Sequence, residues 1–324
     1  MKKLVVVICA VVSLSCAKKS TLNEITFALD WTPNTNHSGI FAAQELGFFD
    51  AEGLKVTIVQ SPEDGAVVLT ASGSADFGVD FQESLGPAIA LARDPLPVIA
   101  VAAIVNHNTS GLMSLQESGI ARPADLQGKR FASWQTATVD AIIKVLVEND
   151  GGVFDKVNMI PNNAVDAFSA LQTDIDSIWI YYAWDGIAAE VNNIPINFID
   201  IAKTNPLFDW YTPVIIANKN YAAQAPDTTR KFLRAVSKGY DYVIANPKEA
   251  ADILLKAAPE LDPLLVKASM DYLAPLYKAG QDRWGEIDAA RWNNFYSWMY
   301  ENKLLEVDIA HNSNGTGFTN EFLP

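Results

Sequence analysis

The sequence predicts an α/β protein made of two lobes with a central cleft. Segments typical of strands and helices alternate along the 324 residues, several strands are continuous apolar runs such as residues 98–104, and the pattern starts again after Gly111. Alternating strands and helices with apolar strands indicate parallel sheets that helices cover on both faces. A chain of this length can form two domains with cores of ordinary size.

Lobe 1 is predicted to comprise residues 24–111 and 214–324. Its first part is expected to alternate strands at 25–29, 54–60, 76–79 and 98–104 with helices at 39–46, 65–72 and 83–92. A strand at 214–217 is expected to return to this lobe. The helices that follow are expected at 228–245, 247–257, 263–276 and 288–302.

Lobe 2 is predicted to comprise residues 112–213. Strands are expected at 130–133, 158–160, 177–181 and 196–200, with helices at 138–149, 164–172 and 183–191. No long linker or internal repeat separates the two lobes, so short crossovers should join them.

The N-terminus has the features of an export signal. Residues 1–15 combine Lys2 and Lys3, an apolar run at 4–12 that is too short to span a bilayer, and small residues before Cys16. This arrangement predicts a signal peptide, lipidation of Cys16 and a polar tether over residues 16–23. Leu14 lies two residues before the cysteine, where the usual lipoprotein pattern has leucine three before, so cleavage without lipidation remains an alternative.

The body of the chain is therefore expected outside the cytoplasm, as a membrane-anchored periplasmic or cell-surface protein. Cys9 and Cys16 are its two cysteines and both fall in the N-terminal segment, so no disulfide, thiolate metal site or cysteine nucleophile is expected in the body. The net charge of −14, without a basic run, argues against nucleic acid as a partner. Because the common nucleotide-binding and nucleophile motifs are missing, we expect no catalytic residues, no cofactor and no metal, and hence no enzyme.

Aromatic and amide side chains follow the predicted strands. In parallel sheets, ligands bind beyond the carboxyl ends of the strands, where such loops meet. These loops contain neither arginine nor lysine, which favours a flat, largely uncharged heteroaromatic ligand. The candidate ligand-binding residues are Trp31, Asn34, His37, Gln82, Glu83, His107, Trp134, Tyr182, Trp184, Asp185 and Tyr211.

Each candidate also has a structural alternative. Trp31 is compatible with simple packing at a domain boundary, and Asn34 beside Pro33 is compatible with a turn. His37 precedes a helix and is compatible with a capping role. The presence of polar amides at several strand ends is the observation that favours a binding site over packing.

Several motifs resemble those of the periplasmic-type binding proteins for thiamine pyrimidine precursors, a family that also includes the fungal pyrimidine synthase of thiamine biosynthesis. The similarity extends over about residues 25–302. The most specific motif is Asp30-Trp-Thr-Pro-Asn-Thr-Asn-His-Ser-Gly39. Further matching segments are Gly47-Phe-Phe-Asp-Ala-Glu-Gly-Leu54, Asp76-Phe-Gly-Val-Asp-Phe-Gln-Glu83, His107-Asn-Thr-Ser-Gly111, Gly128-Lys-Arg-Phe-Ala-Ser-Trp134, Trp184-Asp-Gly-Ile187 and Trp210-Tyr-Thr-Pro-Val214.

The resemblance implies a type II periplasmic-binding-protein fold that closes on a pyrimidine, with the permease and ATPase subunits of an ABC importer as partners. It places Trp31, Asn34 and His37 in the pocket, because they lie in the most specific motif. The other candidate residues lie in less specific motifs, so the resemblance supports them less strongly. The family's Trp-Glu-Gly phrase is Trp184-Asp185-Gly186 here, so the carboxylate is one methylene shorter. Riboflavin therefore remains an alternative ligand.

Two further alternatives remain. A sulfonate or nitrate receptor would need cationic donors near the ligand, which the strand-end loops do not supply. A pyrimidine synthase like the fungal enzymes would, by resemblance, use a histidine and iron with a cysteine-rich motif. The absence of cysteine from the body of the chain and the export signal both count against it.

Overall fold

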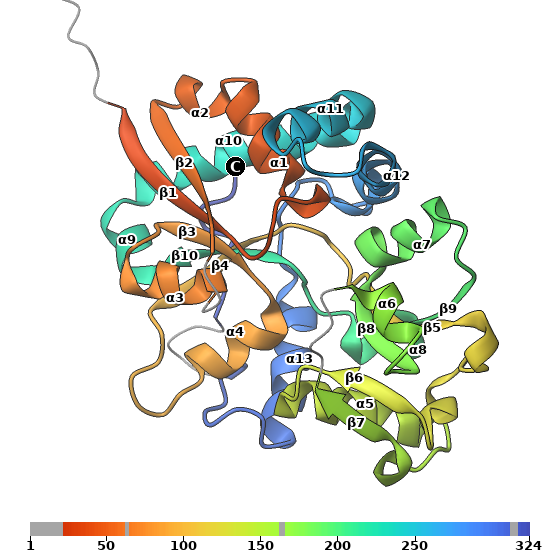
Figure 1. Ribbon diagram of the computed structural model, residues 1–324. Helices are drawn as coiled ribbons and strands as arrows, with labels where there is room; N and C mark the ends of the chain where they lie inside the picture. The colour runs from red at the N-terminus through yellow and green to blue at the C-terminus, as the bar shows by residue number, and fades with distance from the viewer. Residues whose placement is uncertain (1–21, 62–64, 162–165, 312–316) are drawn as a thin grey trace, which may run out of the picture.

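The computed structural model describes residues 22–61, 65–161, 166–311 and 317–324. Within them, two separate five-stranded sheets, sheet A and sheet B, occupy different halves of the molecule (Figure 1). The predicted signal peptide, Cys16 and most of the tether fall outside the described residues. The first strand already begins at Asn23, which the sequence analysis assigned to the tether.

Sheet A has the strand order β2–β1–β3–β10–β4. Its strands are Asn23–Leu29 (β1), Leu54–Gln60 (β2), Phe77–Asp80 (β3), Val98–Ala103 (β4) and Val214–Asn218 (β10). Sheet B has the order β7–β6–β8–β5–β9. Its strands are Ser110–Leu115 (β5), Arg130–Ser133 (β6), Asn158–Pro161 (β7), Ser177–Tyr181 (β8) and Ile196–Asp200 (β9).

Both sheets are mixed, so the prediction of parallel sheets was wrong for one strand in each. β10 pairs antiparallel with β3 and β4, and β5 pairs antiparallel with β8 and β9. The physical reason is the path of the chain. The other strands of each sheet end at the edge that faces the opposite sheet, whereas β5 and β10 enter from that edge directly after a crossover. We call residues 104–109 and 209–213 the first and second crossover.

Strand β5 was not predicted from the sequence. Its first residues, Ser110 and Gly111, suggested a break in the pattern. In the structure, a Cβ atom on Gly111 would lie 2.4 Å from the Phe198 ring and 2.5 Å from the Ile199 carbonyl oxygen. The glycine therefore permits close approach of β9, and the chain enters sheet B just before residue 112, where the second lobe was predicted to start.

Sheet A is covered on one face by helices from both ends of the chain. Figure 1 shows α1, α2, α10, α11 and α12 gathered above it. These helices are Ser38–Glu45 (α1), Phe48–Ala51 (α2), Pro226–Ala245 (α10), Pro247–Ala257 (α11) and Pro263–Leu273 (α12). Their apolar faces form one buried cluster with the sheet, in which Phe232 stacks on both Phe49 and Phe77. The C-terminal tail is thus part of this half of the molecule.

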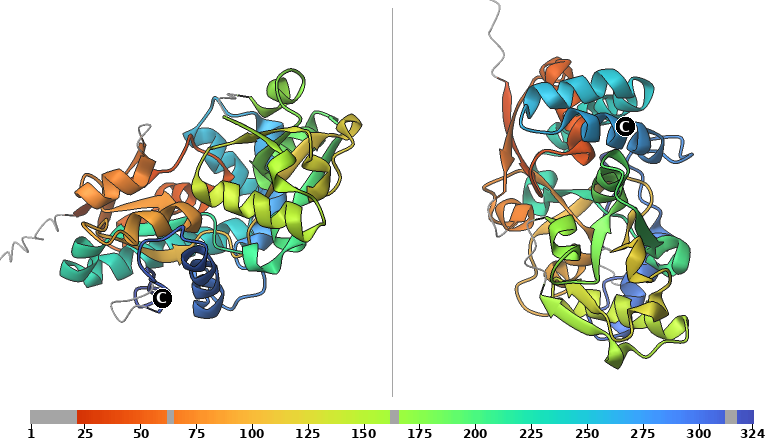
Figure 2. Two further views of the ribbon diagram at one scale, coloured as in Figure 1. Left: turned by 90° about the horizontal axis from the view of Figure 1, so that it is seen from below. Right: turned by 45° about the vertical axis from the view of Figure 1, so that its right-hand side comes forward.

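A second buried cluster continues from the opposite face of sheet A to sheet B. It includes Ile216 of β10, Phe131 of β6 and Phe295 of helix α13, Ala289–Glu301. The views in Figure 2 show α13 in blue between the two halves. Because its apolar residues contribute to this shared core, α13 holds polar residues beside the crossovers.

The remaining helices position the loops at the facing edges. They are Gly65–Ser72 (α3), Gln82–Ile89 (α4), Ala137–Asn149 (α5), Ala167–Leu171 (α6), Ile187–Val191 (α7), Ile201–Thr204 (α8) and Lys219–Gln224 (α9). The helix predicted at 164–172 begins in residues outside the described ranges. The helix predicted at 183–191 consists of a π-helical turn, Tyr182–Gly186 (η5), followed by α7.

Candidate functional site

One group of polar residues joins the two sheets, and we call it the central cluster: Asp30, Asp80, Glu83, Tyr181 and Thr212. The Tyr181 hydroxyl, at the end of β8, donates to Oε1 of Glu83 at the start of α4, with 3.4 Å between the oxygens. The same hydroxyl lies 3.5 Å from Oγ1 of Thr212 in the second crossover. The Tyr181 ring also stacks on Phe81, with centroids 5.7 Å apart. Side chains from both sheets and a crossover therefore meet here.

Burial raises the pKa of two carboxyl groups of the central cluster, those of Asp80 and Glu83. Burial raises the pKa of Glu83 to about 8, and the nearby charge of Asp80 adds to the effect. Burial likewise raises the pKa of Asp80 to about 6, against the opposing hydrogen bond from Ser84. At neutral pH, Glu83 is therefore mostly an uncharged carboxylic acid.

Two oxygens in this cluster make no hydrogen bond of good geometry among the described residues, although the Trp210 indole lies near enough to Glu83 to lower the pKa of its carboxyl slightly. They are Oε2 of Glu83 and Oδ2 of Asp80, and both are buried. Oδ1 of Asp80, in contrast, accepts from the Ser84 hydroxyl at 2.7 Å. A buried polar atom without a partner is costly in a folded protein, so such an atom is a candidate for contact with a bound molecule.

The loop after β1 divides into an exposed and a buried part. Trp31 is 69% exposed, whereas the side chain of His37 has no exposed surface. Nδ1 of His37 accepts from the Asn34 backbone N–H at 3.2 Å, and Nε2 lies 2.6 Å from Oδ1 of Asp30. Oδ1 of Asn34 accepts from the Asn36 backbone N–H at 2.9 Å. His37 and Asn34 therefore hold the loop in shape, as the capping alternative expected, while the indole of Trp31 is free to contact a ligand.

A buried hydroxyl on α12 connects this loop to η5. Oγ of Ser269 lies 2.6 Å from Oγ1 of Thr35 and donates to the Ala183 carbonyl oxygen. The Tyr277 hydroxyl donates to the carbonyl of Thr35 at 2.6 Å. The Trp31 loop and the π-helical turn that carries Tyr182, Trp184 and Asp185 are thus fixed to the same helix.

The three candidates on η5 have different surroundings. Burial raises the pKa of Asp185 to about 6, despite a hydrogen bond from the backbone of Tyr181. Trp184 packs against the buried cluster above sheet A. The Tyr182 hydroxyl donates to Glu190, and its ring lies 5.4 Å from that of Tyr272. Of these three, Asp185 combines partial burial with a pKa raised well above the usual value of an aspartate.

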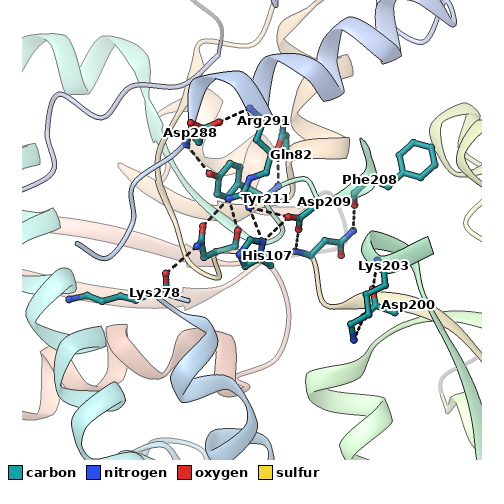
Figure 3. Close-up of polar contacts among 12 residues, drawn as sticks. Gln82, His107, Asp200, Lys203, Phe208, Asp209, Tyr211, Lys278, Asp288 and Arg291 are labelled. Carbon is teal, nitrogen blue, oxygen red and sulfur yellow. Dashed lines mark hydrogen bonds and ion pairs between the residues drawn. The ribbon is translucent and has the colours of Figure 1, made fainter. Parts of the chain in front are cut away.

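A second group of polar residues lies at the crossovers, and we call it the crossover network: Asn106, His107, Asp209, Tyr211 and Arg291. Arg291 Nη1 lies 2.9 Å from Nδ1 of His107 and 3.2 Å from Oδ2 of Asp209. Nη2 donates to the backbone oxygen of Asn106 at 2.6 Å and to its Oδ1 at 2.8 Å. Figure 3 shows these contacts around the labelled Arg291, His107 and Asp209.

The crossover network corrects the expectation of a region without cations. The strand-end loops contain no arginine, but α13 brings Arg291 to the loop that carries His107. Its guanidinium carbon lies 3.9 Å from the centroid of the Tyr211 ring. The carboxylate of Asp209 is held ionised, because hydrogen bonds from His107 and Asn108 and the charge of Arg291 lower its pKa against the effect of burial.

Gln82 and Tyr211 are fully buried and support this network. Oε1 of Gln82 accepts from the Tyr211 backbone N–H at 2.9 Å, and Nε2 donates to the Trp292 carbonyl at 3.1 Å. The Tyr211 hydroxyl accepts from the Asp288 backbone N–H at 2.8 Å. These contacts fix the second crossover to α4 and α13, as Figure 3 shows for the labelled residues. Both side chains have structural partners in place of a free face toward a ligand.

Trp134, after β6, is a further exposed aromatic residue of sheet B. It is 46% exposed and its ring lies 6.0 Å from that of Trp179. It therefore resembles Trp31 in exposure, on the opposite sheet. The roles of these eleven candidates in ligand binding remain predictions.

Sequence reasoning missed several residues of the two groups. Asp30 and Tyr181 border the predicted strands, and a strand-end criterion that included carboxylates and hydroxyls would have found them. No such signal marked Asp209, Thr212 or Arg291. Arg291 is far away in sequence and reaches the crossovers only through the packing of α13. Among the described residues there is no group of three or more His, Cys, Asp and Glu residues that could hold a metal ion.

The sequence is similar to two proteins of known function over nearly its whole length. It is 29% identical over 326 residues to the formylaminopyrimidine-binding protein of Halalkalibacterium halodurans, covering 95% of this chain and 96% of the relative. It is 26% identical to the 4-amino-5-hydroxymethyl-2-methylpyrimidine phosphate synthase THI11 of Saccharomyces cerevisiae, covering 93% and 88% of the two chains. The relatives thus include both a binding protein and an enzyme.

The fold is that of known binding proteins. The structure matches the alkanesulfonate-binding protein SsuA from Xanthomonas axonopodis pv. citri with a TM-score of 0.68, 14% identity, and coverage of 88% of this chain and 95% of that chain. This likeness confirms the predicted type II periplasmic-binding-protein fold and carries no information on the ligand. No helix within the described ranges is long and apolar enough to cross a membrane. Residues 34–250 match the model of the family described as NMT1/THI5 like, and the chain therefore belongs to that family.

Proposed function

We propose that the protein is an extracytoplasmic receptor that binds a thiamine-related aminopyrimidine and delivers it to an ABC importer. The observation that carries this proposal is the protonated, partly unpartnered carboxyl of Glu83 between the two sheets. A neutral carboxylic acid offers one donor and one acceptor side by side. An aminopyrimidine offers the complementary pair, an exocyclic amino group and a ring nitrogen.

The surrounding residues supply the other requirements of such a ligand. Trp31 and Trp134 are exposed aromatic faces on opposite sheets, suited to stacking on a flat ring. Asp185 offers a second carboxyl that burial keeps partly protonated. The similarity to the formylaminopyrimidine-binding protein supports the same class of ligand. Lipidation of Cys16 and the partnership with permease and ATPase subunits are part of this proposal.

Calorimetry with the purified protein tests the ligand class. We expect saturable binding of formylaminopyrimidine or of 4-amino-5-hydroxymethyl-2-methylpyrimidine, and no heat with taurine or nitrate. Riboflavin serves as the flat heteroaromatic competitor. Absence of binding to both pyrimidines would refute the proposal, and binding of riboflavin alone would redirect it to a flavin receptor.

The matched pair Glu83→Leu and Gln44→Leu tests the hydrogen bonds proposed for Glu83. Leucine removes both the donor and the acceptor of the carboxyl, so we expect pyrimidine affinity to fall by about 2 kcal/mol, a typical value for a buried hydrogen-bonded pair. Glu83→Gln keeps one donor and one acceptor, as the neutral acid does, and should retain most of the affinity. Gln44 lies on α1, bonds the Val56 carbonyl, and serves as a control away from the cluster. Unchanged affinity in Glu83→Leu would remove this residue from the site.

A further inference from the structure

A surface cavity of about 310 Å³ lies beside both crossovers. It is lined by residues of the first crossover, by Asp209 of the second, by α8 and the turn after it, and by the end of α12. The lining residues on which the argument depends are Thr109, Asp200, Lys203, Asp209, Tyr272 and Leu276. The volume is at the lower end of the ~300–1,000 Å³ that ligand pockets occupy.

This crossover cavity is distinct from the central cluster. The second crossover contributes to the two places with different residues, since Thr212 contacts Tyr181 of the cluster whereas Asp209 lines the cavity. None of the five residues of the central cluster lines the cavity. The cavity and the central cluster are therefore separate places where side chains from both halves of the protein meet.

The carboxylates in the lining already have partners. Oδ1 of Asp209 accepts from the Asn108 N–H at 2.9 Å, and Oδ2 contacts His107 and Arg291 at 2.7 and 3.2 Å. Oδ1 of Asp200 accepts from the Lys203 N–H at 2.9 Å, and Oδ2 lies 2.9 Å from Nζ of Lys203. Figure 3 shows the two carboxylates with these partners. Neither is free to serve as the main ligand of a cation.

The polar groups of the lining that are not fully hydrogen-bonded are hydrogen-bond donors. Nζ of Lys203 has Asp200 as its one ion-pair partner within the described ranges, which leaves two ammonium hydrogens, and its side chain is 86% exposed. The side-chain hydroxyls of Thr109 and Tyr272 have no hydrogen-bond partner in the same ranges. Ala202, Pro206 and Leu276 provide apolar surface beside them. A matching ligand thus has acceptor oxygens at one end and a compact apolar body at the other.

We propose that the crossover cavity is a second ligand site, which binds a small organic carboxylate with a compact apolar body. The carboxylate accepts from Lys203 and the two hydroxyls, and the body lies against Leu276 and Pro206. An ammonium-to-carboxylate hydrogen bond is stronger than one between neutral groups, so Lys203 is the residue that selects the anion. This site is independent of the pyrimidine proposed for the central cluster.

Ligand-observed NMR and calorimetry with sodium benzoate test the proposal on the full protein. Benzoate should bind saturably, and benzamide, which has the same shape without the charge, should bind about tenfold more weakly. The Lys203→Met variant should bind benzoate about tenfold more weakly than the parent protein. Lys55→Met is the matched control, because Lys55 pairs with Glu24 at 3.0 Å on β2, and it should bind benzoate within about twofold of the parent.

Three results would overturn the proposal. They are no binding of benzoate at about 10 mM, equal binding of benzamide, and an unchanged affinity in Lys203→Met. Tyr272→Phe gives a second measurement, with an expected loss of about threefold from one hydroxyl. Glu83→Leu separates the two proposals, because it should leave benzoate affinity unchanged whether or not the protein binds a pyrimidine.

Discussion

The central cluster and the crossover network both join the two sheets, but they differ in how completely their polar groups are paired. Arg291 and Asp209 use their charged atoms on one another, on His107 and on Asn106. In the central cluster, Oε2 of Glu83 and Oδ2 of Asp80 lack partners among the described residues, and burial raises the pKa of both groups. The crossover network also has one buried donor without a partner within the described ranges, Nε of Arg291, but its two charged groups are otherwise paired with one another. A largely paired network stabilises one geometry, whereas a network with unpaired acceptors has capacity for a ligand. The crossover network should therefore contribute most to the stability of the fold, and the central cluster should contribute most to ligand binding.

The largest expected effect is on the crossover network. Arg291→Met keeps an apolar side chain but removes the guanidinium over Tyr211, and it leaves the ionised Asp209 and the oxygens of Asn106 without their cation. Breaking a largely buried ion pair typically costs about 3–5 kcal/mol, and we expect a loss of this size in the free energy of unfolding by urea. Arg230→Met is the control, since its contacts with Asp227 and Glu321 lie at the surface and should contribute less than about 1 kcal/mol. A similar loss in both variants would contradict a special role for Arg291.

The pH dependence of stability should distinguish the central cluster. The pKa of Glu83 is raised in the folded protein, so the folded state holds a proton that the unfolded state releases above about pH 4.5. The free energy of unfolding should therefore fall as pH rises from about 5 to 8 and level off above about 8. Glu83→Gln removes this proton linkage and should reduce the fall by about 3–4 kcal/mol, measured by urea unfolding at several pH values. Equal pH profiles for both proteins would show that Glu83 is not protonated when folded.

Pyrimidine binding should depend on pH in the same direction. The proposed pair uses the protonated carboxyl of Glu83, so affinity should decline as pH rises through about 8. Each pH unit above that value should cost up to about 1.4 kcal/mol. Calorimetry at pH 6, 7, 8 and 9 measures this dependence, and an affinity that rises through this range would place the charged carboxylate at the ligand instead.

Trp31→Ala should separate binding from stability. Stacking of a base on an aromatic side chain contributes about 1–3 kcal/mol, and we expect a loss in that range for pyrimidine binding. Because the indole is 69% exposed, the free energy of unfolding should change by less than about 0.5 kcal/mol. His37→Ala is the informative contrast, since it removes a buried ring bonded to Asp30 and Asn34 and should destabilise the loop. A Trp31→Ala variant with unchanged affinity would assign that side chain to packing or to another partner.

Features of the fold that depend on interactions between residues close in sequence were predicted well, and features that depend on distant residues were not. The strand limits at 54–60, 177–181 and 196–200 agree with β2, β8 and β9, because apolar runs between turn residues are local signals. The direction of β5 and β10 was not predictable in this way, since it follows from where the crossovers enter each sheet. The exposure of Trp31 and the enclosure of His37 were also undecided, because both types occur in loops as ligands and as caps. Arg291 is the clearest omission, as its position depends on a helix 184 residues after His107.

The smallest expected effect concerns the link between the two sheets at Tyr181. Its hydroxyl lies 3.4 Å from Oε1 of Glu83 and 3.5 Å from Oγ1 of Thr212, which are long distances for hydrogen bonds, while its ring stacks on Phe81. Tyr181→Phe retains the stack and should therefore cost no more than about 1 kcal/mol in unfolding, measured beside Phe81→Leu, which removes the aromatic contact. The change should also leave Glu83 with one hydrogen bond fewer and shift the pH at which pyrimidine affinity declines. A loss as large as that of Arg291→Met would mean that the central cluster is a structural network like the crossovers, and that its free oxygens are not kept for a ligand.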